Sequence, residues 1–299
     1  MSTRRDLGQR MLAALAGPRY GRPAEIVSGV RLGVHTRSFR ELPRKAGTDE
    51  VDTIIQALAE CGVHECELFA PQVEARFGGD HGAAHHGTMS AMSPQMMRRE
   101  LRKWRLRTPL DHFRAIGHRF KKAGITVYAY NYSPDPSFTD EEIDRGFGMA
   151  KALGAEIITA STTLDMAKRI APFAEHHQMV VAMHGEIGTP AGFAAVTVMS
   201  KFFKVHLDVG HFAAGHFDAV EYIRQHHAEI TNLLLSDRRK NQGDDLPWGR
   251  DDAPIREVLL LLKREAWPIR AYVEHEYPGA RDPIEEVKKC IAYAKQVLL

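Results

Sequence analysis

Short apolar runs recur along the chain, separated by segments with helical periodicity. Eight runs rich in β-branched and aliphatic residues are predicted to be strands, at 31–36, 65–70, 125–131, 155–161, 179–185, 203–209, 230–236 and 269–275. Most of them are continuously apolar instead of alternating. That is the pattern expected of strands covered on both faces, as in a parallel sheet.

The segments between the runs predict helices. Residues 49–61 repeat apolar side chains at helical spacing and stop at Gly62, a residue typical of helix C-termini. Thr139 and Glu142 have the spacing of a capping box that opens a helix over 139–153. Further helices are expected at 110–123, 163–176, 217–227, 255–264 and 283–297, with a weak one at 191–200.

This order of elements predicts one large domain. Strand and helix alternate eight times in 299 residues, which suits a closed (β/α)8 TIM barrel. A doubly wound open sheet is the competing fold, but no Gly-x-Gly-x-x-Gly follows the first strand. We therefore predict a single-domain α/β TIM barrel over 30–299, preceded by an N-terminal helical extension over 1–29. The long connections 71–109 and 237–252 leave the carboxyl ends of strands, so we expect lids or substrate-binding loops there.

Charge and cysteine content narrow the class of partner. Lys and Arg number 40 and Asp and Glu 38, a net charge of +2, so neither a nucleic-acid nor a membrane-surface partner is expected. A small molecule is the expected partner. Three cysteines without a Cys-x-x-Cys pair indicate a reducing, cytoplasmic location, although Arg4-Arg5 gives the N-terminus a faint twin-arginine character that leaves export open. No apolar stretch approaches the roughly 20 residues of a membrane span.

Polar residues stand at the carboxyl ends of several expected strands, which form the active-site face of a TIM barrel. They are His35 at the first, His184 and Glu186 at the fifth, Asp208 and His211 at the sixth, Asp237 and Arg238 at the seventh, and Glu274 and Glu276 at the eighth. We expect His184 and Glu186 to point the same way, because strand side chains alternate with period two. Carboxylates at such positions are costly to bury unless they are paired or metal-bound. A shared Mn²⁺, Mg²⁺, Fe²⁺, Co²⁺ or Zn²⁺ would offset that cost, and no organic cofactor is expected.

Structural interpretations of the same residues remain open. Asp208 could cap the turn after its strand, and Glu274 could form an ion pair with Arg238 or Arg270. His211 could pack as an ordinary, partly buried histidine. Glu276 is expected in a loop or supporting role.

Other polar residues are interpreted as structural. Glu65 and Glu67 stand at the start and middle of the second expected strand, so the inward-facing one is either structural or a pocket lining. Three histidine pairs lie in polar stretches or at helix ends, where a cation is mildly favourable, and are interpreted as inert: His85–His86, His176–His177 and His226–His227.

Four motifs together resemble the xylose-isomerase-like barrel superfamily, and within it the sugar phosphate isomerase/epimerase branch. They are Leu-Asp-Val-Gly-His at 207–211, Tyr-Val-Glu-His-Glu-Tyr-Pro-Gly at 272–279, Gly-Val-His-Thr-Arg-Ser-Phe at 33–39 and Cys-Glu-Leu-Phe at 66–69. The resemblance implies one divalent metal at the barrel mouth. Asp208 and Glu274 match the family's metal ligands, and His211 matches a ligand or substrate contact.

Two departures from the family pattern bear on that metal. The fifth strand ends in His184-Gly185-Glu186, where the family often has Glu-Asn-His or His-Asn-His. The seventh has Leu234 where the family commonly has a histidine ligand. The site is therefore expected to use three protein ligands plus water, drawn from Asp208, Glu274, His184, Glu186 and His211, or to be degenerate.

The leading functional prediction is a divalent-metal-dependent isomerase or epimerase of a sugar, sugar phosphate or cyclic polyol. Glu274 would move the proton on one face of the substrate, and His184 or Glu186 on the other, through an enediolate. His35, Asp237, Arg238 and Trp248 are the expected substrate contacts. The alternatives are a metal-dependent dehydratase or lyase acting on a keto-inositol or keto-glycoside, and a non-catalytic carbohydrate-binding barrel. A homo-oligomer is left open.

Overall fold

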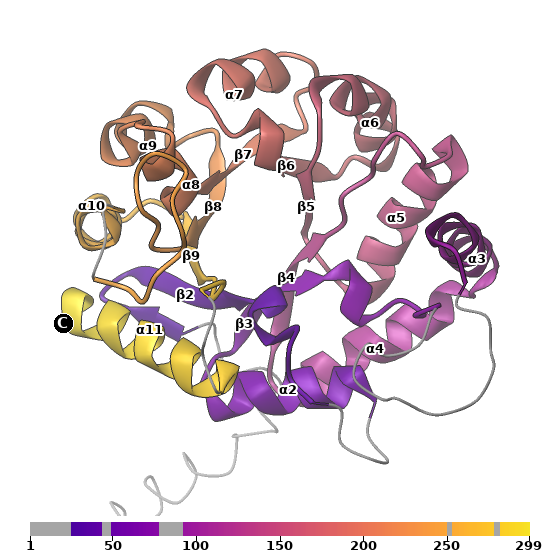
Figure 1. Cartoon of the computed structure of the whole chain (residues 1–299), viewed down its shortest axis with the longest axis horizontal. Coiled ribbons are helices and arrows are strands. Elements are labelled where there is room, and N and C mark those ends of the chain that lie inside the picture. Colours follow the sequence, from indigo (N-terminus) through magenta and orange to yellow (C-terminus); the bar gives the residue numbers. More distant parts are fainter. Residues whose placement is uncertain (1–24, 44–48, 78–91, 250–252, 278–281) are drawn as a thin grey trace, which may run out of the picture.

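The computed structural model describes residues 25–43, 49–77, 92–249, 253–277 and 282–299. Within them, eight parallel strands follow one another around a closed sheet, and the first pairs with the last (Figure 1). They are β2 (Val30–His35), β3 (Glu65–Phe69), β4 (Thr126–Asn131), β5 (Ile157–Ser161), β6 (Val180–His184), β7 (Phe203–Asp208), β8 (Ile230–Leu235) and β9 (Arg270–Val273). Each overlaps one predicted run, so the predicted TIM barrel is confirmed.

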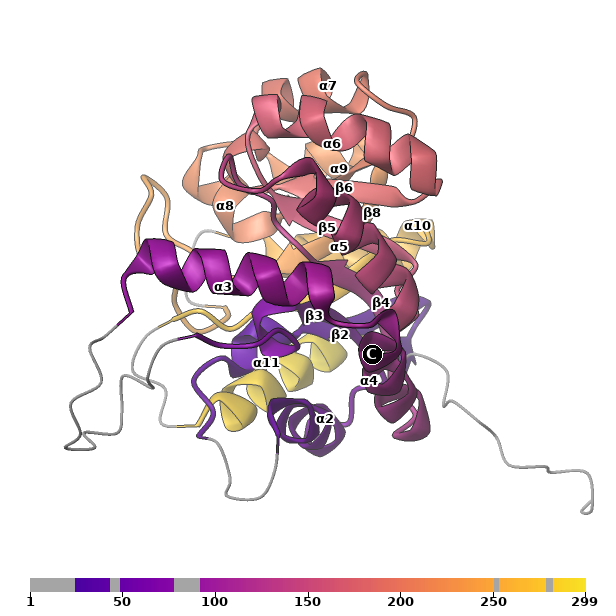
Figure 2. The ribbon, with the colours of Figure 1, turned by 90° about the vertical axis from the view of Figure 1, so that its right-hand side faces the viewer.

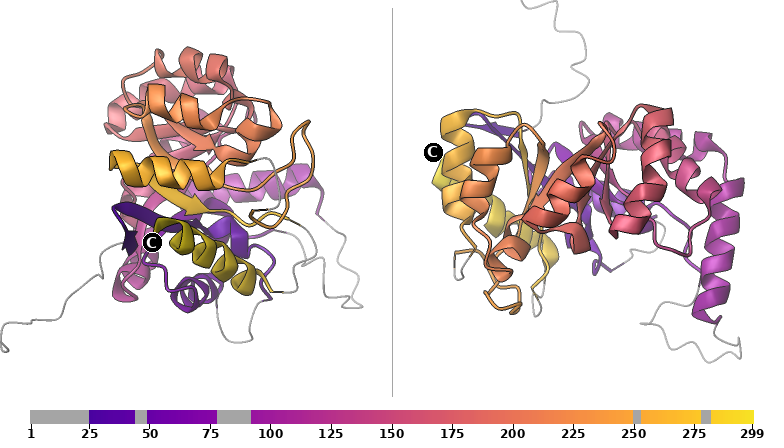
Figure 3. Two further views of the ribbon diagram at one scale, coloured as in Figure 1. Left: turned by 90° about the vertical axis from the view of Figure 1, so that its left-hand side faces the viewer. Right: turned by 90° about the horizontal axis from the view of Figure 1, so that it is seen from above.

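Helices on the outside of the barrel carry the chain from each strand to the next (Figures 1 and 3). They are α2 (Glu50–Glu60), α4 (Leu110–Lys122), α5 (Asp140–Leu153), α6 (Leu164–His177), α7 (Pro190–Thr197), α9 (Ala219–His226) and α10 (Ile255–Glu265), and α11 (Pro283–Leu298) follows the last strand. The expected capping box opens α5: Thr139 Oγ1 accepts from the Glu142 N–H at 3.3 Å, and Glu142 Oε2 accepts from the Thr139 N–H at 3.2 Å. None of the described helices has both the length and the apolar character needed to cross a membrane.

The connection after β3 contains a helix that the apolar pattern did not predict. This helix, α3 (Pro94–Arg107), lies on the outer side of α5 (Figures 1 and 2). The Ser93 side chain caps its N-terminus, and a proline occupies its first turn. The predicted loop 71–109 is therefore partly helical, while 78–91 lies outside the described residues.

One short strand precedes the barrel. β1 (Glu25–Val27) pairs antiparallel with β2. It forms the end of the segment 1–29, for which a helical extension is predicted. Residues 1–24 lie outside the described residues, so that extension stays a prediction.

Apolar side chains pack in two places. The main core lies between the strands and the helices around them and includes Val34, Leu68 and Phe212. A smaller cluster joins Ala129, Ile157, Ala182, Leu234 and Tyr272, which come from strands around the whole barrel and therefore meet in its interior. Polar side chains also occupy the barrel interior, and they extend to the candidate site at the barrel mouth.

Candidate functional site

The carboxyl ends of the strands bring the predicted site residues to one end of the barrel. His35 ends β2, His184 ends β6, Asp208 ends β7, and Glu274 directly follows β9. Because parallel strands all point the same way around the barrel, these four side chains surround its mouth.

Asp208 has a structural role at the mouth. Its Oδ1 accepts from the backbone N–H of His211 at 3.0 Å, which caps the short helix α8 (Val209–Ala214), and from the Ser236 hydroxyl at 2.9 Å. Its Oδ2 lies 3.1 Å from His211 Nδ1. The capping interpretation of Asp208 is therefore confirmed, and the same contacts hold its carboxylate in one orientation beside the His211 ring.

Glu274 is held by the first strand of the barrel. His35 Nδ1 lies 2.7 Å from Glu274 Oε1, and both side chains are buried. The alternative ion pairs are wrong, because Arg238 donates to the Gly243 carbonyl and Arg270 donates to Glu65. Burial raises the pKa of Glu274 well above its ordinary value.

Neighbouring carboxylates add to that effect. The negative charges of Glu276 and Asp208 raise the pKa of Glu274 further. Glu276 behaves differently: burial alone would raise its pKa, but Arg37, which donates to Glu276 Oε1 at 2.8 Å, holds that pKa below its ordinary value. Arg37 was not among the predicted site residues. Its position in the 33–39 motif was the available signal.

A buried polar network surrounds Glu67 of β3, and Glu65 on the same strand is also buried, where it accepts from the Tyr272 hydroxyl at 2.9 Å. The Glu67 carboxylate accepts from Thr159 Oγ1 at 2.7 Å, Asn131 Nδ2 at 3.1 Å and Asn232 Nδ2 at 3.0 Å. It also lies 3.4 Å from His206 Nε2. These partners come from β4, β5, β7 and β8, so the contacts cross the barrel interior.

Histidines connect this network to the mouth. His184 Nε2 lies 3.4 Å from the Asn131 amide nitrogen, and the His184 ring packs edge-on against His206 with centroids 4.8 Å apart. Burial, with smaller effects from nearby positive charge, lowers the pKa of His184 to about 3. Its imidazole is therefore neutral at physiological pH, the form that binds metals and accepts protons.

Glu186 lies apart from these residues. β6 ends at His184, Gly185 adopts φ +78°, and residues Gly185–Ile187 form a 3₁₀ turn. The period-two argument that paired Glu186 with His184 is therefore wrong at this point of the chain. Glu186 is exposed and, together with Thr163 and Lys168, lines a surface pocket of about 410 Å³.

The residues predicted to contact substrate on the long loop after β8 hold that loop in place. Asp237 Oδ2 accepts from the Gly249 N–H at 2.7 Å, and Arg238 donates to the Gly243 carbonyl at 2.8 Å. Trp248 packs edge-on against Tyr293 of α11, with centroids 6.0 Å apart. These contacts favour a structural role for all three, and their role in binding substrate stays a prediction.

The residues at the mouth suit a divalent cation by their chemistry. Asp208 and Glu274 are buried carboxylates whose negative charges repel each other, and neutral His184 is a third donor. Leu234 lies opposite Asp208 in the sheet register, and its side chain packs in the interior apolar cluster, so it adds no donor. The mouth residues do not form a group of three ligand atoms within 4.8 Å among the described residues, so binding would require side chains to rotate.

Comparison with known proteins identifies the fold. No family model and no curated protein matches the sequence. Among solved structures, a sugar phosphate isomerase/epimerase from Parabacteroides distasonis superposes with a TM-score of 0.58 at 15% identity, covering 93% of this chain and 97% of that one. D-psicose 3-epimerase from Clostridium cellulolyticum superposes with a TM-score of 0.60 at 13% identity, covering 89% of this chain and 99% of that one. A probable 3-DHS dehydratase from Bacillus anthracis superposes with a TM-score of 0.60 at 12% identity, covering 89% of this chain and 98% of that one. The chain therefore has the fold of the xylose-isomerase-like barrels, as its sequence motifs predicted.

Proposed function

We propose that this protein is a divalent-metal-dependent isomerase or epimerase that acts on a sugar, sugar phosphate or cyclic polyol. The observation that carries the proposal is the pair of buried carboxylates at the barrel mouth, Asp208 at the end of β7 and Glu274 just after β9, on either side of β8. Burial and then the negative charges of Glu276 and Asp208 raise the pKa of Glu274, and Arg37 Nε, the nearest cationic group of the described residues, lies 4.0 Å from Glu274 Oε1. A divalent cation would neutralise both carboxylates at once.

Asp208, Glu274 and His184 would hold that cation, with His211 as a further ligand or a substrate contact. When bound, the metal supplies Lewis-acid polarisation of a substrate carbonyl. The chain's own residues must then move a proton between adjacent carbons. Manganese, magnesium, iron, cobalt and zinc all suit such mixed carboxylate and imidazole ligands.

Two groups on different walls suit that proton movement. Glu274 has a raised pKa, and its hydrogen bond from His35 fixes its orientation. His184 on β6 is neutral and has one free lone pair, so it can either bind the metal or accept a proton from a carbon beside a carbonyl, but it cannot do both at once. Glu186 can share this role only if the 3₁₀ turn that carries it moves toward the mouth.

Partly exposed cationic and polar groups complete a pocket suited to hydroxyl groups. The side chains of Arg37 and His211 are each 41% exposed, while their inner ends touch Glu276 and Asp208. Guanidinium and imidazole groups in such positions donate to sugar hydroxyls or to a phosphate. A small carbohydrate is therefore the proposed ligand.

Two other functions share parts of this evidence. Elimination, as in a dehydratase, begins with the same proton abstraction, and one similar fold is named as a probable dehydratase. A carbohydrate-binding barrel without catalysis is favoured by Leu234, which fills the place of a family ligand with an aliphatic side chain. Analysis of the reaction product separates the first alternative, and the experiment below separates the second.

The test combines elemental analysis with hydrogen exchange at carbon. Protein purified without chelator is expected to contain a divalent metal held at the mouth, so its metal content should fall by about one ion per chain in Asp208→Asn. A panel of ketoses and inososes is then incubated in D₂O with Mn²⁺ and followed by ¹H NMR. At least one substrate should exchange the hydrogen beside its carbonyl for deuterium, and Asp208→Asn should abolish that exchange.

Asp218→Asn is the matched control. Asp218 caps α9 as Asp208 caps α8, but it belongs to the surface and not to the mouth. It should keep full activity. Absence of metal together with absence of exchange on every substrate would reject the enzyme and leave the carbohydrate-binding barrel.

A further inference from the structure

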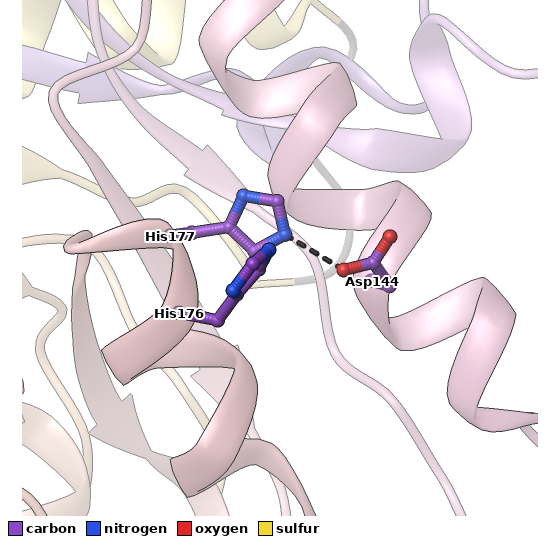
Figure 4. Close-up of side chains that lie close together, drawn as sticks. All are labelled: Asp144, His176 and His177. Carbon is purple, nitrogen blue, oxygen red and sulfur yellow. Dashed lines mark hydrogen bonds and ion pairs between the residues drawn. The ribbon is translucent and has the colours of Figure 1, made fainter.

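Asp144, His176 and His177 form a compact group of ligating side chains away from the mouth (Figure 4). One ligand atom from each lies within 4.8 Å of the other two. No other three histidine, cysteine, aspartate or glutamate side chains in the described part of the chain meet that closely. His177 Nε2 lies 2.8 Å from Asp144 Oδ1, and the two histidine rings pack edge-on with centroids 5.1 Å apart.

The surroundings hold one ligand in place and leave the others accessible. The His177 ring stacks on Phe147 of α5 with an interplanar angle of 7°, which fixes its plane. His176 is exposed and the Asp144 side chain is 50% exposed, so an ion can reach both from solvent. Within the described residues His176 makes no hydrogen bond, so its ring is free to rotate toward a metal.

The helix end itself favours a cation. His176 and His177 occupy the last turn of α6, where the carbonyl groups give the helix terminus partial negative charge. Asp144 comes from α5, so the group joins two adjacent helices. In the sequence this histidine pair looks inert, because the aspartate that completes the group lies more than thirty residues away in the chain.

The group lies in the outer layer of helices, with its two histidines toward the end of the barrel opposite the mouth. α6 begins after the carboxyl end of β5 and ends just before β6 begins. Its C-terminus is therefore at the amino-terminal ends of the strands, a face of TIM barrels that serves stability and not catalysis. A metal there would be independent of the proposed reaction.

We propose that Asp144, His176 and His177 form a second metal site, which binds a late first-row transition ion such as Zn²⁺ and clasps α5 to α6. Two imidazoles and one carboxylate suit Zn²⁺, Co²⁺, Ni²⁺ or Cu²⁺, with water completing the coordination. Mg²⁺ prefers oxygen ligands and keeps most of its water, so it should not bind here. Binding replaces the His177–Asp144 hydrogen bond by bonds from both side chains to the ion.

The test measures Zn²⁺ binding to the full-length, chelator-stripped protein by calorimetry, with millimolar Mg²⁺ present throughout. The variant is His176→Gln, and the matched control is His226→Gln, an exposed histidine in the last turn of α9 whose ring lies near Glu229. Loss of a direct ligand should weaken binding at this site at least as much as loss of a supporting group does in metal sites, about tenfold or more. The control should leave Zn²⁺ affinity and stoichiometry unchanged.

Two further readouts place the ion. Zinc-edge anomalous diffraction should show a peak between Asp144, His176 and His177, and Zn²⁺ should raise the thermal midpoint of the wild type more than that of His176→Gln, which keeps only the mouth site. The proposal is overturned if His176→Gln binds Zn²⁺ as tightly and in the same number as the wild type. It is also overturned if His226→Gln loses as much binding, because surface histidines in general would then be responsible.

Discussion

At the scale of single residues, the centre of the barrel depends on Glu67. Its side chain is fully buried, and three neutral donors from three different strands satisfy its carboxylate. Burial raises the pKa of Glu67, while His35 and the hydrogen bonds from Thr159 and Asn131 oppose that rise. Such a network is stable only while every member keeps its partner, since an unpaired buried polar group costs about 1–3 kcal/mol.

We therefore expect Glu67→Leu to destabilise the fold strongly. Leucine has a similar size, so little cavity is created, but Thr159, Asn131 and Asn232 lose their acceptor. The free energy of unfolding should fall by about 3–5 kcal/mol, the usual cost of removing one partner from a buried network. Denaturant titration measures this directly.

The control for Glu67→Leu is Glu141→Leu in the exposed first turn of α5, which should change stability by less than about 0.5 kcal/mol. Equal stability of the two variants would mean that the donors around Glu67 find water or one another instead.

A second prediction at this scale concerns the charge of His184. Burial disfavours the imidazolium form and lowers the pKa of His184 to about 3. In metal-free protein, ¹⁵N-detected NMR should show the His184 ring neutral from pH 8 down to the acid limit of folding. In urea-unfolded protein the same ring should titrate near the ordinary value of about 6.5. A midpoint near 6.5 in the folded state would show that solvent fills the mouth around this ring.

At the scale of elements, α3 is held mainly by charge. Arg98 donates to both carboxylate oxygens of Glu142 at 2.7 and 2.9 Å, and Arg102 donates to Oε2 at 2.7 Å. The Glu142 side chain is fully buried beneath these arginines. Burial alone would raise the pKa of Glu142, but the two arginines hold it below its ordinary value, so the carboxylate stays charged.

We expect Glu142→Gln to release α3 while the barrel stays folded. Breaking a buried ion network costs about 3–5 kcal/mol, which corresponds to faster local opening by at least about a hundredfold. Amide hydrogen exchange over 94–107 should accelerate by that factor, and exchange in α4 should not change.

The exposed pair Glu100–Lys103 on α3 supplies the control. Exposed pairs contribute about 0–1 kcal/mol, so Glu100→Gln should change exchange less than tenfold. Equal acceleration in both variants would show that general loss of helix charge, and not the Glu142 network, controls α3.

Elements differ in how far their sequence predicts them. The eight strands and most outer helices follow from apolar periodicity, because burial against a core leaves that pattern in the sequence. α3 has apolar side chains at helical spacing, Met97, Leu101 and Trp104, but charged residues occupy most of the positions between them, so the apolar pattern is weak. The turn after β6 was misjudged for a local reason: Gly185 takes a left-handed conformation, and a Cβ there would lie 1.9 Å from Ser161 Oγ.

In the candidate site, the sequence likewise predicts where Asp208 and Glu274 lie but not which side chains orient them. Asp208 and Glu274 stand at the mouth because they are attached to strand ends, which the sequence locates. The partners that orient them, His35 for Glu274 and Ser236 for Asp208, depend on the closed sheet and come from distant parts of the chain. Side-chain pairing across a barrel leaves no local signal.

At the scale of the whole molecule, the two proposed sites lie in different parts of one barrel. The mouth gathers Asp208, Glu274 and His184, and the outer layer of helices holds the proposed clasp between α5 and α6. The barrel interior holds both the polar network around Glu67 and the apolar cluster that contains Leu234 and Tyr272. Leu234 stands where the xylose-isomerase-like motifs that this sequence resembles commonly have a histidine.

Leu234→His tests whether an imidazole on β8 can join the proposed metal site. Leu234 is 1% exposed, packs with Ala182 and Tyr272, and lies opposite Asp208 in the β7–β8 register. A polar ring in this space should lower the free energy of unfolding by about 1–3 kcal/mol. If the new imidazole reaches the ion held by Asp208 and Glu274, Mn²⁺ should bind at least about tenfold more tightly in calorimetry, because one more strong ligand is present.

Leu234→Asn separates ligation from polarity, since its amide is also polar but is a weaker metal ligand than an imidazole. It should destabilise the fold by a similar amount without the tenfold gain in Mn²⁺ affinity. Unchanged Mn²⁺ affinity in a folded Leu234→His protein would mean that the side chain at position 234 of β8 does not face the metal site. The ligand set would then have to be built from the β2, β6, β7 and β9 residues alone, with Ser236 and water beside Asp208.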